Sequence, residues 1–395
     1  MIKKNVLITL TVLVLTVSLN ADESDWNPIL YWDGTYCYID TQGNIQLQGP
    51  YEEAYKFNNE LARVKIDGKY VFINKEGNVV IDLPTKAKDD DAVAYNIQCD
   101  FSDGFALVHI QSYNKRLDGE GFINTRGEHV ISSTADYDSS IGDISDFRNG
   151  FALIYKNDLY GYINTEGKEV IEAKYKEAYN FSDGLARVKF PNTNKYGYIN
   201  EDGKAVIRPE YTKAYDFSDG LALVKIPDTK IDYHYGFINQ VGDLVIDCVE
   251  VSENNKNPNE KIYSIGEDIN QFYDGIAVIG HSPGRDENGT HLFLNTQGEV
   301  EFKLDLTGFS IFNSGCAFVS QQVKTYDYDR ENQSLYIKHT RKNWGLIDTD
   351  GEYVVPLQYE WYPVSVFNNG IAKVKDRETG KVQYINTNGD IIYTE

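Results

Sequence analysis

The sequence is constrained most by a short motif that recurs nine times along the chain. Each copy has an aromatic residue (once Leu), Ile or Leu, Asn or Asp, two variable residues and Gly. The copies begin at Tyr38, Phe72, Phe122, Tyr162, Tyr198, Phe237, Phe293, Leu346 and Tyr384. Such a period is typical of solenoids and propellers, in which each repeat buries its apolar face against its neighbours. The chain is therefore predicted to be an array of small repeated units.

A second motif alternates with the first and consists of Phe, a turn and a short strand centred on Ala. The clearest copy runs from Phe217 to Val224, with Ser-Asp-Gly in the turn. The alanines of the eight copies are Ala62, Ala106, Ala152, Ala186, Ala222, Ala277, Ala317 and Ala372. A residue that stays this small in every copy indicates a crowded position, where a larger side chain would overpack the core.

The local pattern of one unit predicts strands and turns. Leu221 to Lys225 alternates apolar residues with others that could face either layer, and the aromatic and β-branched residues of Tyr235 to Asn239 suit a half-buried strand. The Asn and Gly that follow favour a hairpin turn, after which Leu244 to Ile246 completes an antiparallel meander. A connector such as Tyr211 to Phe217 is either a fourth short strand or a single helical turn. No longer stretch has helical periodicity with caps, so the fold class is predicted to be all-β.

Counting from the alanine strand gives nine units, the first starting at Ile29 to Trp32. Propellers commonly have about four to eight blades, so nine units leave two architectures open. We expect tandem antiparallel β-meanders closed into a propeller-like ring, with an open β-solenoid superhelix as the alternative. Residues 22–395 are expected to form a single domain.

Taken together, the two motifs resemble the WG-repeat family, also called KWG repeats. The first appears as Trp344-Gly345-Leu346-Ile347-Asp348 and Tyr196-Gly197-Tyr198-Ile199-Asn200, and the second is clearest at Phe181 to Ala186. The resemblance covers about residues 28 to 393, although only Trp344 gives the literal Trp-Gly. It implies a β-rich, mostly bacterial repeat protein without an assigned activity, and it carries over no catalytic residue.

A weaker likeness concerns the hairpin turn alone, which is similar to the choline-binding type of cell-wall-binding repeat. That likeness implies glycan binding by the aromatic residues. The other interpretation is that these aromatic side chains belong to the core. The Gly-Trp that begins such repeats is absent from this sequence.

The first 21 residues have the pattern of a signal peptide. Lys3 and Lys4 precede an apolar run from Val6 to Val17, and the best cleavage point follows Ala21. The protein is therefore expected to be exported to the periplasm, the cell envelope or the exterior. An uncleaved segment that anchors the protein in the membrane is the alternative.

The formal net charge of -22 limits the partners. Nucleic acid is a poor partner for such a chain, because phosphate binding needs clustered basic surface. Cations or basic protein surfaces are better matches. Alternatively, the negative charge needs no partner and simply gives the protein a soluble exterior that repels other copies.

Cysteines, histidines and acidic clusters give no catalytic or metal-binding pattern, and no cofactor is predicted. Cys37, Cys99, Cys248 and Cys316 have no paired spacing, and a disulfide among them stays open. The histidines show no metal-ligand spacing; they are His109, His129, His234, His281, His291 and His339. Asp348 to Gly351 is interpreted as a hairpin turn and not as a calcium loop. Asp327, Asp329 and Glu331 are interpreted as a solvated acidic loop.

Long insertions interrupt the repeat and are predicted to be loops, which in repeat proteins often lie on the binding face. They are residues 88–91, 253–261, 282–290 and 321–340. We predict a noncatalytic module that binds protein or glycan at the envelope, with unknown ligand-binding residues. The alternative is a hydrolase in which two carboxylates from separate units meet in a cleft with perturbed pKa values.

Overall fold

The computed structural model describes residues 26–30, 34–86, 93–112, 119–132, 145–228, 232–248, 271–280, 289–329, 334–359 and 361–395. Its regular elements are β-strands, which form nine small antiparallel sheets. Within these ranges no helix is long and apolar enough to cross a membrane. The predicted signal segment and the insertions 88–91 and 253–261 lie outside the described residues, as does most of 282–290.

Each sheet is one blade, made of strands that follow one another in sequence. Blade 1 is β1 (Asn27–Leu30), β2 (Tyr36–Ile39) and β3 (Ile45–Tyr51); blade 2 is β4 (Glu53–Asn58), β5 (Leu61–Ile66), β6 (Lys69–Ile73) and β7 (Val79–Ile81). Blade 3 is β8 (Val93–Ile97), β9 (Phe105–Ser112), β10 (Gly119–Asn124) and β11 (His129–Ser132); blade 4 is β12 (Phe151–Lys156), β13 (Leu159–Asn164) and β14 (Glu169–Tyr175).

The remaining blades continue this order. Blade 5 is β15 (Glu177–Ser182), β16 (Leu185–Lys189), β17 (Tyr196–Ile199) and β18 (Ala205–Tyr211); blade 6 is β19 (Leu221–Asp228), β20 (Asp232–Asn239) and β21 (Leu244–Asp247). Blade 7 is β22 (Ala277–Gly280), β23 (Gly289–Leu294) and β24 (Val300–Leu306); blade 8 is β25 (Gly308–Phe309), β26 (Cys316–Asp329), β27 (Ser334–Asp348) and β28 (Tyr353–Tyr359). Blade 9 is β29 (Trp361–Pro363), β30 (Ile371–Asp376), β31 (Val382–Asn386) and β32 (Ile391–Thr394).

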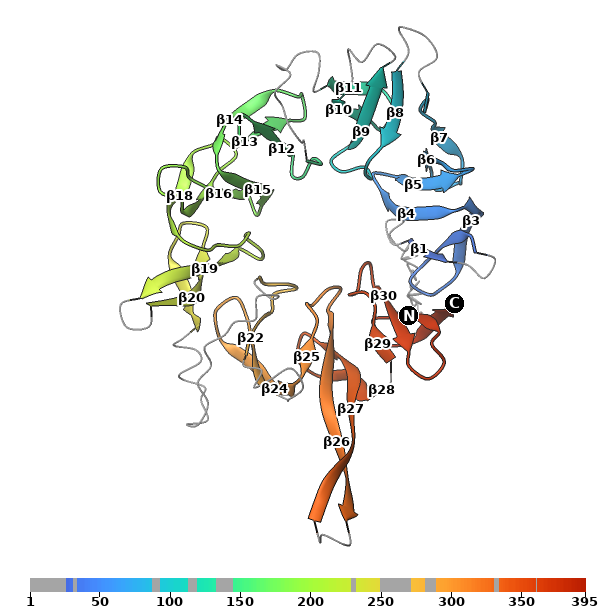
Figure 1. Ribbon diagram of the computed structural model, residues 1–395, viewed down its shortest axis with the longest axis vertical. Helices are drawn as coiled ribbons and strands as arrows, with labels where there is room; N and C mark the ends of the chain where they lie inside the picture. Colours follow the sequence, from blue (N-terminus) through green and yellow to red (C-terminus); the bar gives the residue numbers. More distant parts are fainter. Residues whose placement is uncertain are drawn as a thin grey trace, which may run out of the picture.

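The nine blades form a ring, with β12 and β15 nearer its centre and β14 and β18 at its rim (Figure 1). The protein is thus a nine-bladed β-propeller, and the open solenoid was the wrong alternative. The connector is a short strand in five blades, namely β4, β8, β15, β25 and β29. In blade 6 a single bridge between Ala214 and Val224 takes its place.

Ring closure comes from packing between the first and last blades, whose sheets share no strand. Ile29 and Ile39 of blade 1 form one buried cluster with Ile371 and Tyr384 of blade 9. Like the other junctions, this seam is formed by buried aliphatic and aromatic side chains of two adjacent blades. Closing the ring buries apolar surface that an open array would leave exposed at both ends.

The glycine of the first motif explains why this packing repeats so regularly. Gly203 has φ of +72°, and a Cβ on it would lie 3.2 Å from Ile171 in the outer strand of the preceding blade. The same contact recurs at all nine junctions, in the pairs Gly43–Ile392, Gly77–Leu47, Gly127–Ile81, Gly167–Ile131, Gly203–Ile171, Gly242–Ile207, Gly298–Ile246, Gly351–Phe302 and Gly389–Val355. Glycine is therefore needed both for the turn and for the close approach of the next blade.

The core lies between adjacent blades and contains both motifs. The cluster at the junction of blades 4 and 5 joins Tyr162 and Ile171 to Phe181 and Ala186. All eight alanines of the second motif are at most 1% exposed, which confirms the crowded position predicted for them. Their Phe partners are likewise buried, as are Tyr38, Tyr162 and Tyr198 of the first motif. These aromatic residues are core residues.

The turn of the second motif also joins neighbouring blades. Its central residues have positive φ, as in Asp219 (53°) and Gly220 (80°), which is the geometry of a tight hairpin turn. The side chain in the Asp position accepts a hydrogen bond from the glycine N–H of the next blade's turn. This contact occurs in the pairs Asn59–Gly104, Asp103–Gly150, Asp183–Gly220, Asp219–Gly275, Asp274–Gly315 and Ser314–Gly370.

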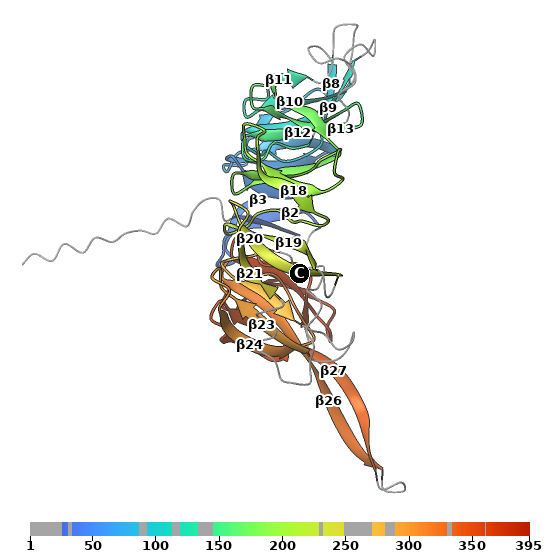
Figure 2. The ribbon, with the colours of Figure 1, turned by 90° about the vertical axis from the view of Figure 1, so that its left-hand side faces the viewer.

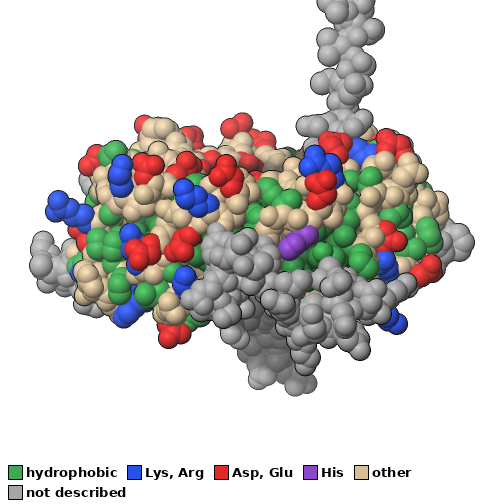
Figure 3. Space-filling view, turned by 90° about the horizontal axis from the view of Figure 1, so that it is seen from above, with side chains coloured by type: hydrophobic (Ala, Val, Ile, Leu, Met, Phe, Trp, Pro, Cys, Tyr) green, Lys and Arg blue, Asp and Glu red, His purple; other side chains and the backbone are tan. Residues whose placement is uncertain are grey.

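The outer strands alternate buried and exposed aliphatic residues. Ile131, Ile171 and Ile207 are buried against the next blade, whereas the preceding Val170 and Val206 are 38% and 41% exposed. Figure 3 shows one side of the ring, where hydrophobic side chains lie among acidic and basic ones. Burial therefore alternates from one residue to the next along the outer strands, as expected for a strand with one buried face.

Blade 8 carries a long two-stranded ribbon formed by β26 and β27, which projects from the ring (Figures 1 and 2). The two strands stay paired from Cys316 and Asp348 to Asp329 and Ser334. The prediction of a loop for residues 321–340 was therefore wrong, since most of this insertion extends the hairpin. Asp327 and Asp329 lie in β26, so the solvated acidic loop was also wrong for these two residues, and Glu331 lies outside the described residues.

Candidate binding pocket

A polar pocket lies where blades 2, 3 and 4 meet. Its volume is about 630 Å³. Blade 2 and its turn provide Tyr55, Asn58, Asn59 and Arg63, the segment before β9 provides residues 98–103, and the segment before β12 provides Asp146 and Arg148. Three units far apart in sequence therefore build one site. The volume lies within the range of about 300–1,000 Å³ that is usual for small-ligand pockets.

Arg63 is the central side chain of the pocket and is only 9% exposed. Its Nε donates to Asp100 Oδ1 at 2.8 Å, and its Nη1 donates to the carbonyl of Gln98 at 3.1 Å. The guanidinium also stacks on the Tyr55 ring, 3.8 Å from the ring centroid. These contacts satisfy a buried cation and fix blade 2 to blade 3.

Glu53 and its hydrogen-bond donors form a second polar group, which holds the hydroxyl of Tyr55. Glu53 accepts hydrogen bonds from Lys65 at 2.8 Å, from Tyr70 at 2.5 Å and from Tyr55 at 3.2 Å. The bonds from Lys65 and Tyr70 lower the pKa of Glu53 from 4.5 to about 2. The carboxylate therefore stays ionised and holds the Tyr55 ring in place for Arg63.

Cys99 and Asp146 give the pocket its unusual electrostatics. Burial raises the pKa of Cys99 to about 12, and the neighbouring Asp146 adds to this by its hydrogen bond and its charge. Burial also raises the pKa of Asp100, which the Arg63 guanidinium opposes and the charge of Asp146 increases. Asp103 accepts from the Gly150 N–H at 2.7 Å. The pocket thus presents carboxylates, a neutral thiol and cations side by side.

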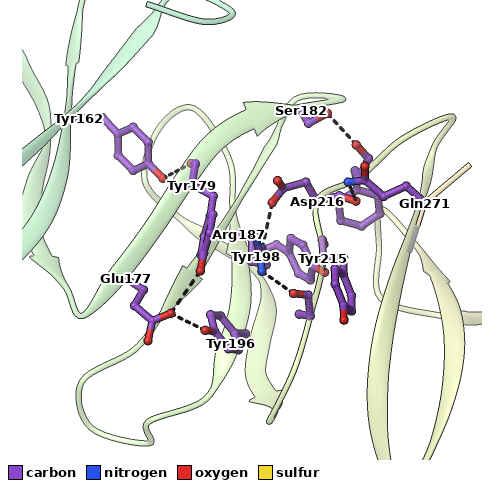
Figure 4. Close-up of polar contacts among 12 residues, drawn as sticks. Tyr162, Glu177, Tyr179, Ser182, Arg187, Tyr196, Tyr198, Tyr215, Asp216 and Gln271 are labelled. Atoms are coloured by element: carbon purple, nitrogen blue, oxygen red, sulfur yellow. Dashed lines mark hydrogen bonds and ion pairs between the residues drawn. The ribbon is translucent and has the colours of Figure 1, made fainter. Parts of the chain in front are cut away.

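The same framework recurs at blades 5 and 6 (Figure 4). Arg187 donates to Asp216 at 2.9 Å and to the carbonyl of Ala214 at 2.5 Å, and it stacks 3.5 Å from the Tyr179 centroid. Lys189, Tyr179 and Tyr196 all donate to Glu177. Burial favours the neutral form of Glu177, but the bonds from Lys189 and Tyr196 outweigh it and lower its pKa.

Six lining positions differ between the two copies, at Asn58, Asn59, Gln98, Cys99, Asp146 and Arg148. The last three lie within two residues of the second-motif Phe of blade 3 or blade 4. Cys99 corresponds to Tyr215, Asp146 to Gln271, and Arg148 to Tyr273, because each precedes or follows the Phe of the second motif by the same number of residues. Tyr215 packs against the core cluster of blades 6 and 7, and Gln271 donates to the carbonyl of Asp216 at 3.0 Å. At blades 2 to 4 a small thiol and two charged residues stand in these places.

Of the cysteines, histidines and acidic residues singled out in the sequence, those that the structure describes do not line this pocket, except Cys99. All four cysteines lie in the described residues and are thiols, with Cys37, Cys248 and Cys316 buried. Asp348 accepts from the N–H groups of Asp350 and Glu352, which confirms a turn at this position. Among the described residues no three His, Cys, Asp or Glu side chains are placed to hold a metal ion.

The pocket itself was not predicted from the sequence. Its signal was the pair Arg63 and Arg187, the only arginines that occupy the position after the alanine of the second motif. An arginine there, together with Asp100 or Asp216 just before the next Phe, marks a junction held by an ion pair. Where the two copies then differ, the differences locate the candidate site.

Five regions of the chain match the family described as "WG containing repeat", at residues 36–70, 121–160, 160–190, 196–226 and 344–378. The predicted resemblance is confirmed in these regions. No curated protein matches the chain in sequence.

Among solved structures, the chain is similar to a "crystal structure of the eukaryotic initiation factor", with 9% identity and a TM-score of 0.55 over 91% of this chain and 93% of that chain. At this identity the likeness shows the propeller fold alone. A protein of unknown function from Bacteroides caccae matches with 16% identity and a TM-score of 0.24, over 60% of this chain and 89% of that chain.

Proposed function

We propose that this chain, a nine-bladed propeller in which five regions match the WG containing repeat, is an exported noncatalytic module that binds a polar ligand between blades 2 and 4. The observation that carries the proposal is the polar pocket of about 630 Å³ at this junction. The resemblance to WG repeats supports a noncatalytic repeat protein, and the pocket supplies a place for binding.

The lining favours a ligand rich in hydroxyl groups, such as a sugar unit of an envelope glycan. Carboxylate and amide oxygens of Asp100 and Asn58 are acceptors, Arg148 is a donor, and Tyr55 provides a ring. A sugar hydroxyl both donates and accepts, so it matches such a mixed set. A polar loop of a protein partner is the other ligand of this chemistry.

The Arg63–Asp100 ion pair argues against a catalytic role for Asp100. Its counterpart Arg187–Asp216 has the same geometry at blades 5 and 6, so holding two blades together is sufficient reason for the pair. Asp100 is committed to Arg63 and is therefore poorly placed to exchange a proton with a substrate.

The test is calorimetric titration of residues 22–395 with a panel of neutral, amino and acidic sugars, first with the unmodified protein and then with Cys99→Tyr. This variant places the side chain of the blade 6 counterpart, Tyr215, in the pocket. We expect it to weaken binding by at least about tenfold, because the ring fills space that the ligand needs. Tyr215→Cys is the matched control and should bind as the unmodified protein does. Equal binding by Cys99→Tyr would contradict the proposal.

A hydrolase remains the second candidate, because one observation favours it. Asp100 and Asp146 both line the pocket, and burial and the charge of Asp146 raise the pKa of Asp100, so two carboxylates share one site as in glycoside hydrolysis. Product release from a bound oligosaccharide, lost in both Asp100→Asn and Asp146→Asn, would establish this activity. Binding without turnover would support the noncatalytic module.

Export is proposed from the pattern of residues 1–21 alone. Expression of the full sequence in a bacterial host, followed by mass measurement of the protein from each cell fraction, tests it. A mature N-terminus at Asp22 in the exported fraction is the expected result, and full-length protein in the cytosol would contradict it.

A further inference from the structure

The ribbon of blade 8, which we call the arm (residues 321–342), leaves the sheet that it grows from. β25 pairs with β26 only at Val319 and Ser320. On the other side, the pair of β28 with β27 that lies nearest the arm is at Trp344. Beyond these pairs the two arm strands pair only with each other in the described part of the chain. Both edges of the arm therefore carry backbone groups that can pair with a further strand.

The arm also differs from the rest of the protein in charge. It holds five Lys or Arg and three Asp or Glu, so the remainder of the chain has 33 basic and 57 acidic residues. Two of the three acidic residues, Asp327 and Asp329, lie at the end of β26 that is farther from the ring. The root of the arm contains only basic charges, at Lys324, Lys338, Arg341 and Lys342.

The register places three of these cations in consecutive residue pairs of the ribbon. Lys324 pairs with Thr340, Val323 with Arg341, and Gln322 with Lys342. Lys324, Arg341 and Val323 are exposed, and Lys342 lies over the Trp344 ring at 4.9 Å. Because side chains alternate along a strand, Lys324 and Lys342 lie on one face and Arg341 on the other. An anionic strand along either edge would meet a cation.

We propose that the arm docks an acidic, extended segment of a partner protein, which adds as a strand to one of its edges. Backbone pairing provides the affinity in this mode of recognition, and the side chains provide specificity. A two-stranded ribbon is by itself only marginally stable in water, so a third strand also stabilises the arm. This interaction is separate from the pocket, and either can fail without the other.

Charge complementarity decides between this partner and a second copy of the chain. A second copy brings its whole net charge of -22 to the encounter, which opposes self-association at long range, whereas an acidic segment brings only the few charges that the root of the arm can pair with. Open backbone edges in turn favour a polypeptide over a nucleic acid, which has no complementary backbone to pair with them.

The experiment measures fluorescence anisotropy of a labelled peptide of alternating Glu and Val, titrated with residues 22–395. At about 50 mM salt, Lys324→Glu/Arg341→Glu should weaken binding at least tenfold, and about 500 mM salt should weaken binding of the unmodified protein. A second variant, in which Asn-Gly joins Gln322 directly to Lys342, should also lose binding. Equal thermal midpoints show that both variants fold.

Two further probes separate the elements of the proposal. The same peptide with alternate backbone nitrogens methylated keeps its charges and should lose binding, because it cannot add as a strand. A peptide of alternating Lys and Val should not lose affinity in Lys324→Glu/Arg341→Glu, because this substitution replaces repulsion of the peptide at the root by attraction. The proposal is overturned if the methylated peptide binds as well as its parent, if the double variant binds normally, if an oligothymidylate displaces the peptide, or if sedimentation shows that the unmodified protein dimerises through its arm.

Discussion

Blades 2 to 4 and blades 5 to 7 are built on the same polar framework and differ in what surrounds it. Both have a stacked arginine, an aspartate on the next blade and a Glu–Lys–Tyr group behind the tyrosine. Around the first copy stand Cys99, Asp146 and Arg148, and around the second stand Tyr215, Gln271 and Tyr273. The shared residues are explained by blade assembly. The residues that differ are the ones to test for function.

The largest expected effect comes from removing the shared arginine. Arg63→Ala and Arg187→Ala should each lower the free energy of unfolding by about 2–3 kcal/mol, because the partner aspartate and one backbone carbonyl lose their donor at a mostly buried site. Urea unfolding measures this. Arg126→Ala is the control, since Arg126 pairs with Glu128 at the exposed surface and should change stability by less than about 0.5 kcal/mol. A much smaller loss in only one copy would show that the two frameworks are not equivalent.

Exchanging the small and large side chains should have opposite consequences in the two copies. Tyr215→Cys should cost about 1–2 kcal/mol, because part of a core cluster loses its packing. Cys99→Tyr should change stability by less than about 1 kcal/mol, since the pocket can accept the ring. Thermal unfolding of both variants checks this. Strong destabilisation by Cys99→Tyr would mean that the pocket is too narrow for the ring.

The charge of Asp146 should be visible in the reactivity of Cys99. Asp146→Asn removes a charge and a hydrogen bond that raise the thiol pKa, so alkylation by iodoacetamide should begin at lower pH. Burial remains, and the pKa should stay above that of an ordinary thiol. Mass spectrometry of the alkylated protein measures the rate against pH, and Cys99→Ser gives the background from the three buried thiols. An unchanged pH profile would separate Asp146 from Cys99.

The smallest effect concerns Glu53 and the acid limit of stability. A carboxyl group whose pKa is lower in the folded state stabilises the fold above its unfolded pKa, and this contribution disappears as pH falls through the folded value. For Glu53 the window runs from about 4.5 down to about 2. Glu53→Gln should therefore lower the thermal midpoint at pH 7 and have less effect at pH 3. The exposed Glu166→Gln should show no such difference. An equal effect at both pH values would exclude the ionic contribution.

Much of the fold could be predicted because nearly every unit repeats the two motifs that determine its strands, turns and packing. The nine first motifs gave the number of blades, and the repeated alanine gave the tight packing next to the Phe. The wrong prediction at residues 321–340 has a local cause: an insertion was treated as a loop, although Val323 to Tyr326 has the composition of a strand.

The pocket could not be predicted in the same way. Cys99 and Asp146 are unremarkable in their own units, and they matter only because ring geometry brings blades 3 and 4 to Arg63 of blade 2. The turn contacts between blades were missed for the same reason. Their signal, an Asn, Asp or Ser before the turn glycine, is also what a turn requires by itself, so the sequence does not separate the two roles.

The seam between blades 1 and 9 has a consequence for how such rings change in evolution. In the described part of the chain, no strand of blade 1 joins the sheet of blade 9 or the reverse, and the contact of Gly43 with Ile392 repeats the contact found at each of the other junctions. The number of blades is then decided collectively, by the angles that all neighbouring blades prefer. Duplicating one unit would strain every junction slightly, and a chain cut and rejoined at another junction should close into the same ring.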